Sequence, residues 1–132
     1  MVTCLATWGW YDDGPHQRTV EDGEAAIALC REVLASTGER WPAIVSLTTI
    51  GGAYFGIGLA PTAAVVTYWA DPDGPYWQSL GTASVTSVDY VVDGHHSELP
   101  ADAHVPLDGA LSALREFVES GERPSVVEWV ES

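Results

Sequence analysis

Residues 98–129 constrain the fold more than any other stretch, because they contain a helix with both ends marked. Pro106 is typical of a helix start, Gly121 of a helix end, and Pro124 prevents the helix from continuing. Between these residues runs one apolar stripe with the 3.6-residue period of an α-helix. Its members are Leu107, Ala110, Leu111, Leu114, Phe117 and Val118. The stripe predicts an amphipathic helix that packs its apolar side on another layer.

A second helix is predicted near the N-terminus. Thr19 suits its N-cap, with Asp22 three residues later as a variant capping box, and Gly38 suits its C-terminal end. Its apolar stripe consists of Ala26, Leu29, Cys30, Val33 and Leu34. Both cysteines of the chain, Cys4 and Cys30, fall in apolar surroundings without a C-x-x-C motif, which predicts buried, reduced thiols.

Most remaining segments resemble strands. The turn-forming residues 11–16 and 71–75 separate them, and we expect a polar loop at 93–104. The middle strands are joined by short turns, which favour antiparallel pairing. We therefore predict an α+β fold in one domain over residues 1–132. It should contain an antiparallel meander of about five to seven strands, with two main helices on one face. The predicted strands are 2–10, 43–50, 62–69, 76–80, 83–92 and 125–130.

The charge balance is strongly acidic. Nineteen carboxylates oppose five arginines, there is no lysine, and the net charge is −14. Such a surface repels nucleic-acid phosphates and anionic lipid, so neither nucleic acid nor a membrane is an expected partner. It attracts a basic protein or a cation, or it serves solubility alone. No apolar run is long enough to span a bilayer, and the N-terminus lacks the basic flank of a signal peptide, so we expect a cytoplasmic protein.

Catalytic motifs are not recognisable, and we expect neither an enzyme nor a cofactor. The glycines of 51–58 precede a strand rather than a helix, so they indicate a hairpin or bulge instead of a phosphate loop. His96-Ser97-Glu98 lacks the downstream cysteine pair of a zinc deaminase. One alternative stays open, which is a metal-binding enzyme or sensor that uses the loop with His95, His96, Glu98, Asp102 and His104.

Aromatic residues next to carboxylates give a different signal. Tyr76 and Trp77 directly follow the acidic turn of Asp71 and Asp73, and Tyr54 lies in the glycine-rich hairpin. Exposed aromatic side chains of this kind are common anchors of protein interfaces. We expect the remaining tryptophans Trp41, Trp69 and Trp129 in the core. A second alternative is a small-molecule site between sheet and helices, lined by Trp8, Trp10 and Trp69.

The run 73–81 and the helix with its flanks at 106–129 resemble the immunity-protein family that is paired with deaminase toxins in bacterial polymorphic toxin systems. The resemblance covers about the last two thirds of the chain. It rests on an Asp-Gly-Pro turn that leads to an aromatic residue and Leu-Gly, and on a late helix followed by Arg-Pro and Trp. The matching residues are Gly51, Gly52, Asp73, Gly74, Tyr76, Leu80, Gly81, Pro106, Phe117, Gly121, Arg123, Pro124 and Trp129.

This resemblance implies a non-enzymatic inhibitor that binds the catalytic domain of a cognate toxin as a 1:1 heterodimer. A toxin that acts on nucleic acid needs a basic active-site groove, which an acidic protein can occupy. The family's matched residues are caps, turns and core positions, so they do not identify the contacts with the toxin. From chemistry and expected exposure, the predicted toxin-binding residues are Asp12, Asp13, Tyr54, Asp71, Asp73, Tyr76 and Trp77.

Overall fold

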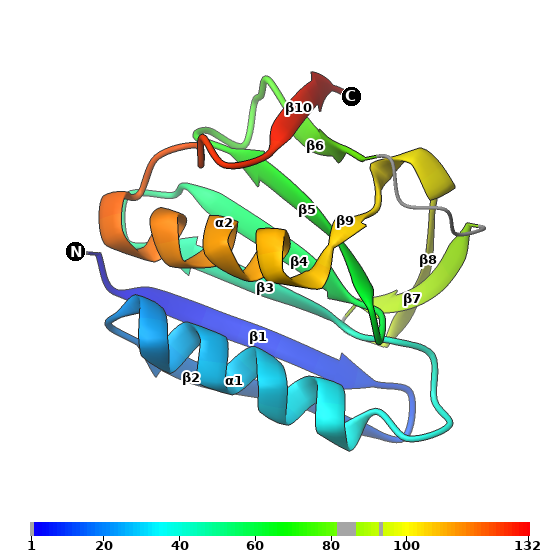
Figure 1. The fold of residues 1–132 in the computed structure, drawn as a ribbon. Helices are drawn as coiled ribbons and strands as arrows, with labels where there is room; N and C mark the ends of the chain where they lie inside the picture. Colours follow the sequence, from blue (N-terminus) through cyan, green and yellow to red (C-terminus); the bar gives the residue numbers. More distant parts are fainter. Residues whose placement is uncertain (1, 82–86, 93) are drawn as a thin grey trace.

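The computed structural model describes residues 2–81, 87–92 and 94–132 (Figure 1). Two α-helices, α1 (Gly23–Ser36) and α2 (Leu107–Ser120), lie side by side on one face of an antiparallel sheet. A short 3-10 helix, η1 (Ala101–Ala103), precedes α2. The strands are β1 (Cys4–Trp10), β2 (Asp13–Val20), β3 (Ile44–Thr49), β4 (Tyr54–Leu59), β5 (Ala63–Trp69), β6 (Trp77–Leu80), β7 (Val88–Val92), β8 (His95–Leu99), β9 (Val105–Pro106) and β10 (Glu128–Glu131).

The main sheet has eight strands in the order β10-β6-β5-β4-β3-β1-β2, with β9 paired to β5. All of its strand pairs are antiparallel in the described residues. After the β1–β2 hairpin the chain forms α1 and returns as β3 on the other side of β1. β7 and β8 form a separate two-stranded sheet. The predicted α+β class is confirmed, and the main sheet has more strands than expected.

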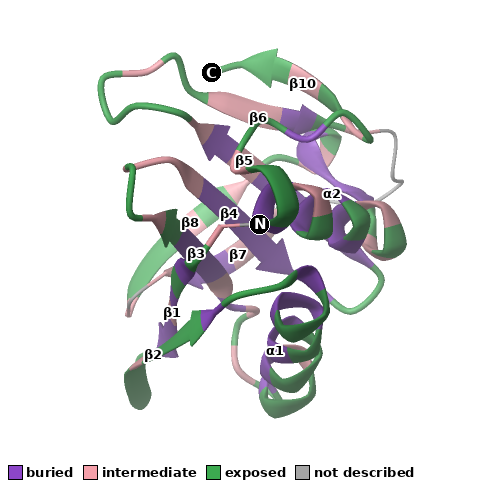
Figure 2. Cartoon of the chain, turned by 90° about the vertical axis from the view of Figure 1, so that its left-hand side faces the viewer, coloured by how far each residue is buried: buried purple, intermediate pink, exposed green. Residues whose placement is uncertain are grey.

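The core lies between the sheet and the two helices, as the buried residues in Figure 2 show. The predicted stripe of α2 is confirmed, with Leu111, Leu114 and Phe117 buried against strands β4 and β5. The rings of Phe55 and Phe117 stack with their centroids 5.2 Å apart. Gly121 ends α2 with a φ of 73°, a left-handed conformation that glycine adopts without steric strain. None of the described helices is both long and apolar enough to cross a membrane.

Both cysteines are free and buried. Desolvation raises the pKa of Cys4 to about 11 and that of Cys30 to about 12, so both thiols stay protonated at neutral pH. The thiolate is the reactive form of cysteine, and these side chains therefore serve as small apolar core residues.

Two polar segments differ from prediction. Thr19 belongs to β2 rather than capping α1, and Asp22 is the N-cap, its Oδ1 accepting a hydrogen bond of 2.7 Å from the backbone N–H of Ala25. Similarly, His95–Leu99 forms strand β8 within the predicted loop. Both strands are exposed on most of their length, so neither shows the apolar alternation by which a half-buried strand is recognised. Part of the predicted strand 83–92 lies outside the described residues.

The β7–β8 hairpin packs against the sheet through Tyr90 of β7. A Cβ atom at Gly58 would lie 2.9 Å from the Tyr90 ring, so β4 requires glycine here for the ring to approach. The Tyr90 hydroxyl bonds Nε2 of the fully buried His104 at 2.9 Å, and Nδ1 of His104 lies 2.9 Å from the Pro100 carbonyl. This buried network holds the hairpin at one end of the sheet.

Candidate functional site

The structure divides the predicted toxin-binding residues between the two ends of the strands. Tyr54 is next to Thr48, whose other neighbour in the sheet is Leu5 of β1. The acidic pair Asp12 and Asp13 lies beyond the opposite end of β1, where Asp13 pairs with Trp10. The two groups are therefore roughly 15–20 Å apart along β1 at about 3.3 Å per residue.

The first group contains a stack of three aromatic rings, Tyr54, Trp69 and Tyr76, which we call the aromatic ladder. Tyr54 and Trp69 are paired in adjacent strands, and their rings are nearly parallel (9°) at 3.9 Å between centroids. Trp69 meets Tyr76 edge to face at 5.5 Å. The Tyr54 hydroxyl lies 3.0 Å from the Ser46 hydroxyl. These contacts fix three partly exposed rings in one orientation.

The ladder lies on the sheet face opposite the helices. Successive residues of a strand point to opposite faces, and Phe55 and Tyr68, the neighbours of Tyr54 and Trp69, contact Phe117 of α2. We expected Trp69 in the core, which is wrong: its side chain is only partly buried and belongs to this outer face. Its alternation partner Tyr68 occupies the core position instead.

The acidic turn next to the ladder is held by its own hydrogen bonds. Oδ1 of Asp71 accepts from the backbone N–H of Asp73 at 2.9 Å, and the Asp71 carbonyl accepts from Gly74 at 2.9 Å. The Tyr76 hydroxyl donates to the carbonyl of Pro72, which ties the ladder to the turn. Asp71 and Asp73 are exposed, and neither forms an ion pair within the described residues. Their charges are available to a partner.

Trp77 is separated from this group by the same strand alternation. It pairs with Tyr68 in the neighbouring strand and packs partly against the core on the helix side. The guanidinium carbon of Arg123 lies 4.3 Å from the centre of its ring. Because Tyr76 and Trp77 are consecutive residues of extended chain, their side chains lie on opposite faces of the sheet.

In the second group, Asp12 lines a groove of about 380 Å³, here called the Trp41 groove. Tyr11 and Trp41 are 61% and 44% exposed, and their rings meet at 5.9 Å. Trp41 was expected in the core, and this is wrong because it packs between Tyr11 and His96 on the molecular surface. The lining residues are Trp10, Tyr11, Asp12, Glu39, Arg40, Trp41 and Val91.

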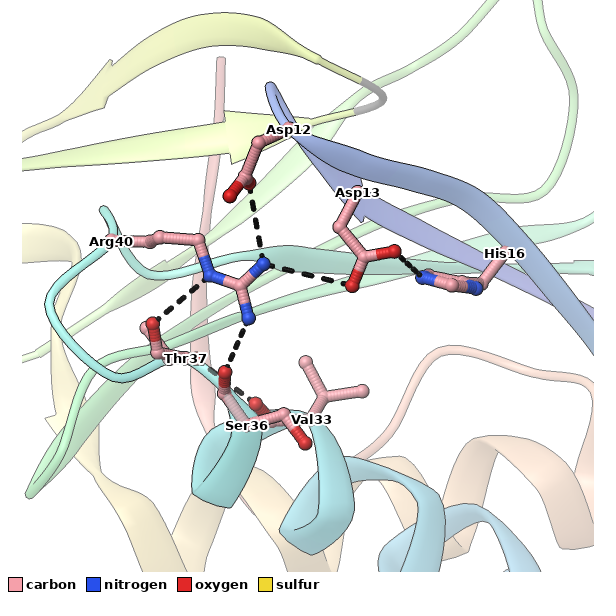
Figure 3. A network of polar contacts seen from close by, with 7 residues as sticks. All are labelled: Asp12, Asp13, His16, Val33, Ser36, Thr37 and Arg40. Atoms are coloured by element: carbon pink, nitrogen blue, oxygen red, sulfur yellow. Dashed lines mark hydrogen bonds and ion pairs between the residues drawn. The ribbon is translucent and has the colours of Figure 1, made fainter.

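Arg40 lines this groove, and Figure 3 shows the polar contacts that hold its side chain. Its Nη1 lies 3.3 Å from Oδ1 of Asp12 and 3.6 Å from Oδ2 of Asp13. Its Nε and Nη2 donate to the carbonyls of Thr37 and Ser36 at the end of α1. The guanidinium carbon also lies 3.9 Å from the centre of the Trp10 ring. The protein therefore binds its own guanidinium between an indole face and two carboxylates.

The metal-site alternative is not supported by the geometry. No group of three or more potential metal ligands occurs among the described residues. His104 is fully buried, and both of its ring nitrogens are used in the network with Tyr90. His96 lies elsewhere, with its ring 4.9 Å from Trp41 and its Nε2 2.6 Å from Oδ1 of Asp89. The residues that are close in sequence are thus dispersed in space.

The residues of the small-molecule alternative are brought together only in part. Trp8 and Trp10 line a cavity of about 240 Å³ near β2 and α1, together with polar residues such as His16 and Glu32. Trp69 does not reach it, because this ring lies in the aromatic ladder on the other face. The cavity therefore lacks one of the three expected aromatic walls.

Sequence reasoning missed Tyr11, Trp41, His96 and the role of Arg40. Tyr11 and Arg40 adjoin predicted features, the acidic turn and the end of α1. No local pattern links Tyr11 and Arg40 to His96. His96 lies in strand β8, which falls within the predicted loop 93–104. The one signal in the sequence for this second surface is Tyr11, an aromatic residue directly before Asp12.

Comparison with known proteins adds a family assignment. The sequence matches the family described as Immunity protein Imm1 over residues 14–131. A search of curated proteins found no match. The matched region includes the aromatic ladder, α2 and four of the seven residues that line the Trp41 groove, and it confirms the resemblance to an immunity-protein family. The chain belongs to the Imm1 immunity protein family.

Proposed function

We propose that this protein binds and neutralises a cognate nucleic-acid-targeting bacterial toxin with a cytidine-deaminase-like catalytic domain. It acts by covering the basic active-site groove of the toxin, without catalysis of its own. Family membership supports the immunity function. The net charge of −14 supports a basic partner, because opposite charges accelerate encounter and favour the correct orientation.

The observation that carries the proposal is the aromatic ladder beside Asp71 and Asp73, two carboxylates that form no ion pair within the described part of the chain. Interface hot spots combine rigid aromatic anchors with a surrounding polar rim. Tyr54, Trp69 and Tyr76 are already held by ring contacts, so they lose little conformational freedom on binding. Asp71 and Asp73 extend from the rim, where they can meet lysine or arginine side chains of the toxin.

The complex is expected to be a 1:1 heterodimer in the cytoplasm of the producing cell. A standard interface covers about 800 Å² on each partner, which is close to a square of roughly 28 Å. The ladder and the Trp41 groove lie at opposite ends of β1, so an interface that includes both has to extend for at least about 15–20 Å along the strands. We assign Tyr54, Asp71, Asp73 and Tyr76 to the central contact and Asp12 and Asp13 to its far end. Trp77 is the weakest of the predicted contacts, because it packs on the helix side.

Co-expression with the toxin domain encoded next to this protein tests the proposal. We expect cells to survive induction of the toxin only when the wild-type protein is present, and the two chains to co-purify in equal amounts. Variant Val126→Ala, which shortens an exposed apolar side chain outside both surfaces, is the matched control and should protect fully. An adjacent toxin that is neither bound nor silenced would contradict the assignment.

A further inference from the structure

Three tryptophans of this protein carry an arginine of the same chain on their rings. Arg18 lies 5.8 Å from the ring of Trp8, Arg40 3.9 Å from Trp10, and Arg123 4.3 Å from Trp77. A guanidinium within about 6 Å of an indole face is attracted by the negative electrostatic potential of the ring. The fold thus uses the same contact repeatedly to hold a cation.

Trp41 has the surroundings for such a contact but carries no arginine of its own chain among the described residues. On one side its ring packs against the ring of His96, with centroids 4.9 Å apart. Its ring is 44% exposed and forms a corner with the exposed ring of Tyr11. Arg40 next to it is already bound to Trp10 and to the carboxylates of Asp12 and Asp13. The chain has no lysine, so few cations of its own remain to cover this ring.

Carboxylates complete the groove around Trp41. Glu39 lines it and takes part in no ion pair within the described chain. Asp12 uses one oxygen for Arg40, and its side chain remains 72% exposed. Aromatic walls with carboxylates at the rim match arginine better than lysine, because the planar guanidinium stacks on rings and donates along its edge at the same time.

We infer that the Trp41 groove receives an arginine side chain of the bound toxin. The inference rests on the proposed function for the identity of the partner. The cation stacks on Trp41 and donates to Glu39 and to the second carboxylate oxygen of Asp12. The pair formed by Arg40 and Trp10 within the same groove is the internal example of this geometry. The site would fix the orientation of the toxin at a point remote from the aromatic ladder.

The first test uses a small probe and needs no toxin. Nα-acetyl-arginine amide is titrated against the wild-type protein, and the indole N–H signals are followed by NMR. Nα-acetyl-citrulline amide has nearly the same shape without the charge and serves as the matched control ligand. We expect saturable shifts at Trp41 with a dissociation constant of roughly 1–10 mM for the arginine probe and no saturation for citrulline.

Variants then locate the site. Trp41→Ala and Glu39→Gln should each weaken binding of the arginine probe, the former by about 5-fold or more. Ile50→Ala, an exposed change at the other end of the strands, should leave it unaltered. Because Trp41 and Glu39 are surface residues, thermal unfolding is expected to confirm that both variants fold. Equal response to citrulline, or full binding by Trp41→Ala, would overturn the site.

The second test measures the affinity of Trp41→Ala for the toxin. We expect a loss of about 10-fold, with a reduced dependence of binding on salt. An unchanged affinity would refute an arginine of the toxin as the occupant, even if the probe binds. If the probe binds but the wild-type protein fails to neutralise the toxin, the proposed function fails while the cation site stands. The two hypotheses are therefore separable.

Discussion

The aromatic ladder and the Trp41 groove both present aromatic rings next to carboxylates, but different forces hold them in place. In the ladder, rings from paired strands stack on one another, and the neighbouring carboxylates have no cationic partner in the described residues. In the groove, a single arginine connects two carboxylates, an indole and the end of α1. Ring stacking thus holds the aromatic ladder in place, whereas charged contacts hold the Trp41 groove.

This difference predicts different roles in binding. Stacked rings lose little freedom when a partner covers them, so they suit the permanent centre of an interface. Charged contacts on an exposed rim add less affinity and depend on salt, but they orient the partner during encounter. We therefore expect ladder variants to change the dissociation rate and groove variants to change the association rate as well.

The largest expected effect is on the free energy of unfolding of the core that both surfaces share. Burial raises the pKa of Cys4 and Cys30 from 9.0 to about 11 and about 12, so the folded state retains protons that the unfolded state loses. The contribution of the two thiols to stability is then fully present well below pH 9 and is lost as the pH rises through 9, by up to about 1.4 kcal/mol per pH unit for each thiol. Urea unfolding between pH 7 and 10.5 measures this decline, and Cys4→Ala should reduce its slope. If the aromatic ladder and the Trp41 groove unfolded in two separate transitions, they would not share one cooperative core.

The next largest effect is expected for Trp69→Ala, which removes the ring between Tyr54 and Tyr76. Loss of a central hot spot should weaken toxin binding by about 30-fold or more, mainly through faster dissociation. Trp69→Phe keeps an aromatic face and should recover part of the affinity. Surface plasmon resonance gives both rates. If Trp69→Ala dissociates at the wild-type rate, the ladder is not the centre of the interface.

Arg40→Met tests whether the charged contacts of Arg40 hold the Trp41 groove together. The variant keeps an apolar stem over Trp10 but removes the contacts to Asp12, Asp13 and the carbonyls at the end of α1. We expect a loss of about 1 kcal/mol in the free energy of unfolding, since most of these contacts are partly exposed. Chemical denaturation provides the value. Wild-type stability would show that the network is not needed to hold the groove.

The smallest effect is expected for Asp71→Asn combined with Asp73→Asn. Asparagine at position 71 retains the oxygen that accepts from the backbone N–H of residue 73, so the turn should persist. Removing two rim charges should slow association about 2- to 5-fold at low salt, with little change in dissociation. At high salt the variant and the wild type should converge. A rate difference that persists at high salt would indicate a direct buried contact instead.

Local signals in the sequence were sufficient for α2. Its proline start, glycine end and apolar stripe act within a few residues, and the structure confirms them. The antiparallel meander followed from short turns in the same way. β2 and β8 were missed for the opposite reason: as exposed polar strands they exist through hydrogen bonds to neighbouring strands, which leave no apolar pattern in their own residues.

The candidate surfaces were only partly predictable. Tyr54 and Tyr76 were identified by their neighbours in the sequence, whereas Trp69 joins them only because β4 and β5 pair in a register that puts it opposite Tyr54. Trp77 was predicted as a contact together with Tyr76, and the structure places its side chain partly against the core on the helix side. A shift by one residue exchanges the two faces.

What the sequence determined by itself is the class of this protein: an acidic α+β chain without lysine, with two helices, buried thiols and the features of an immunity protein. Tertiary structure decided which aromatic and charged residues meet. Trp41 contacts Tyr11 and His96, and Arg40 reaches Asp12, through pairings of segments that are distant along the chain. Helices and turns depend on interactions between near neighbours, while a binding surface depends on strand register and packing, which no short stretch of sequence specifies.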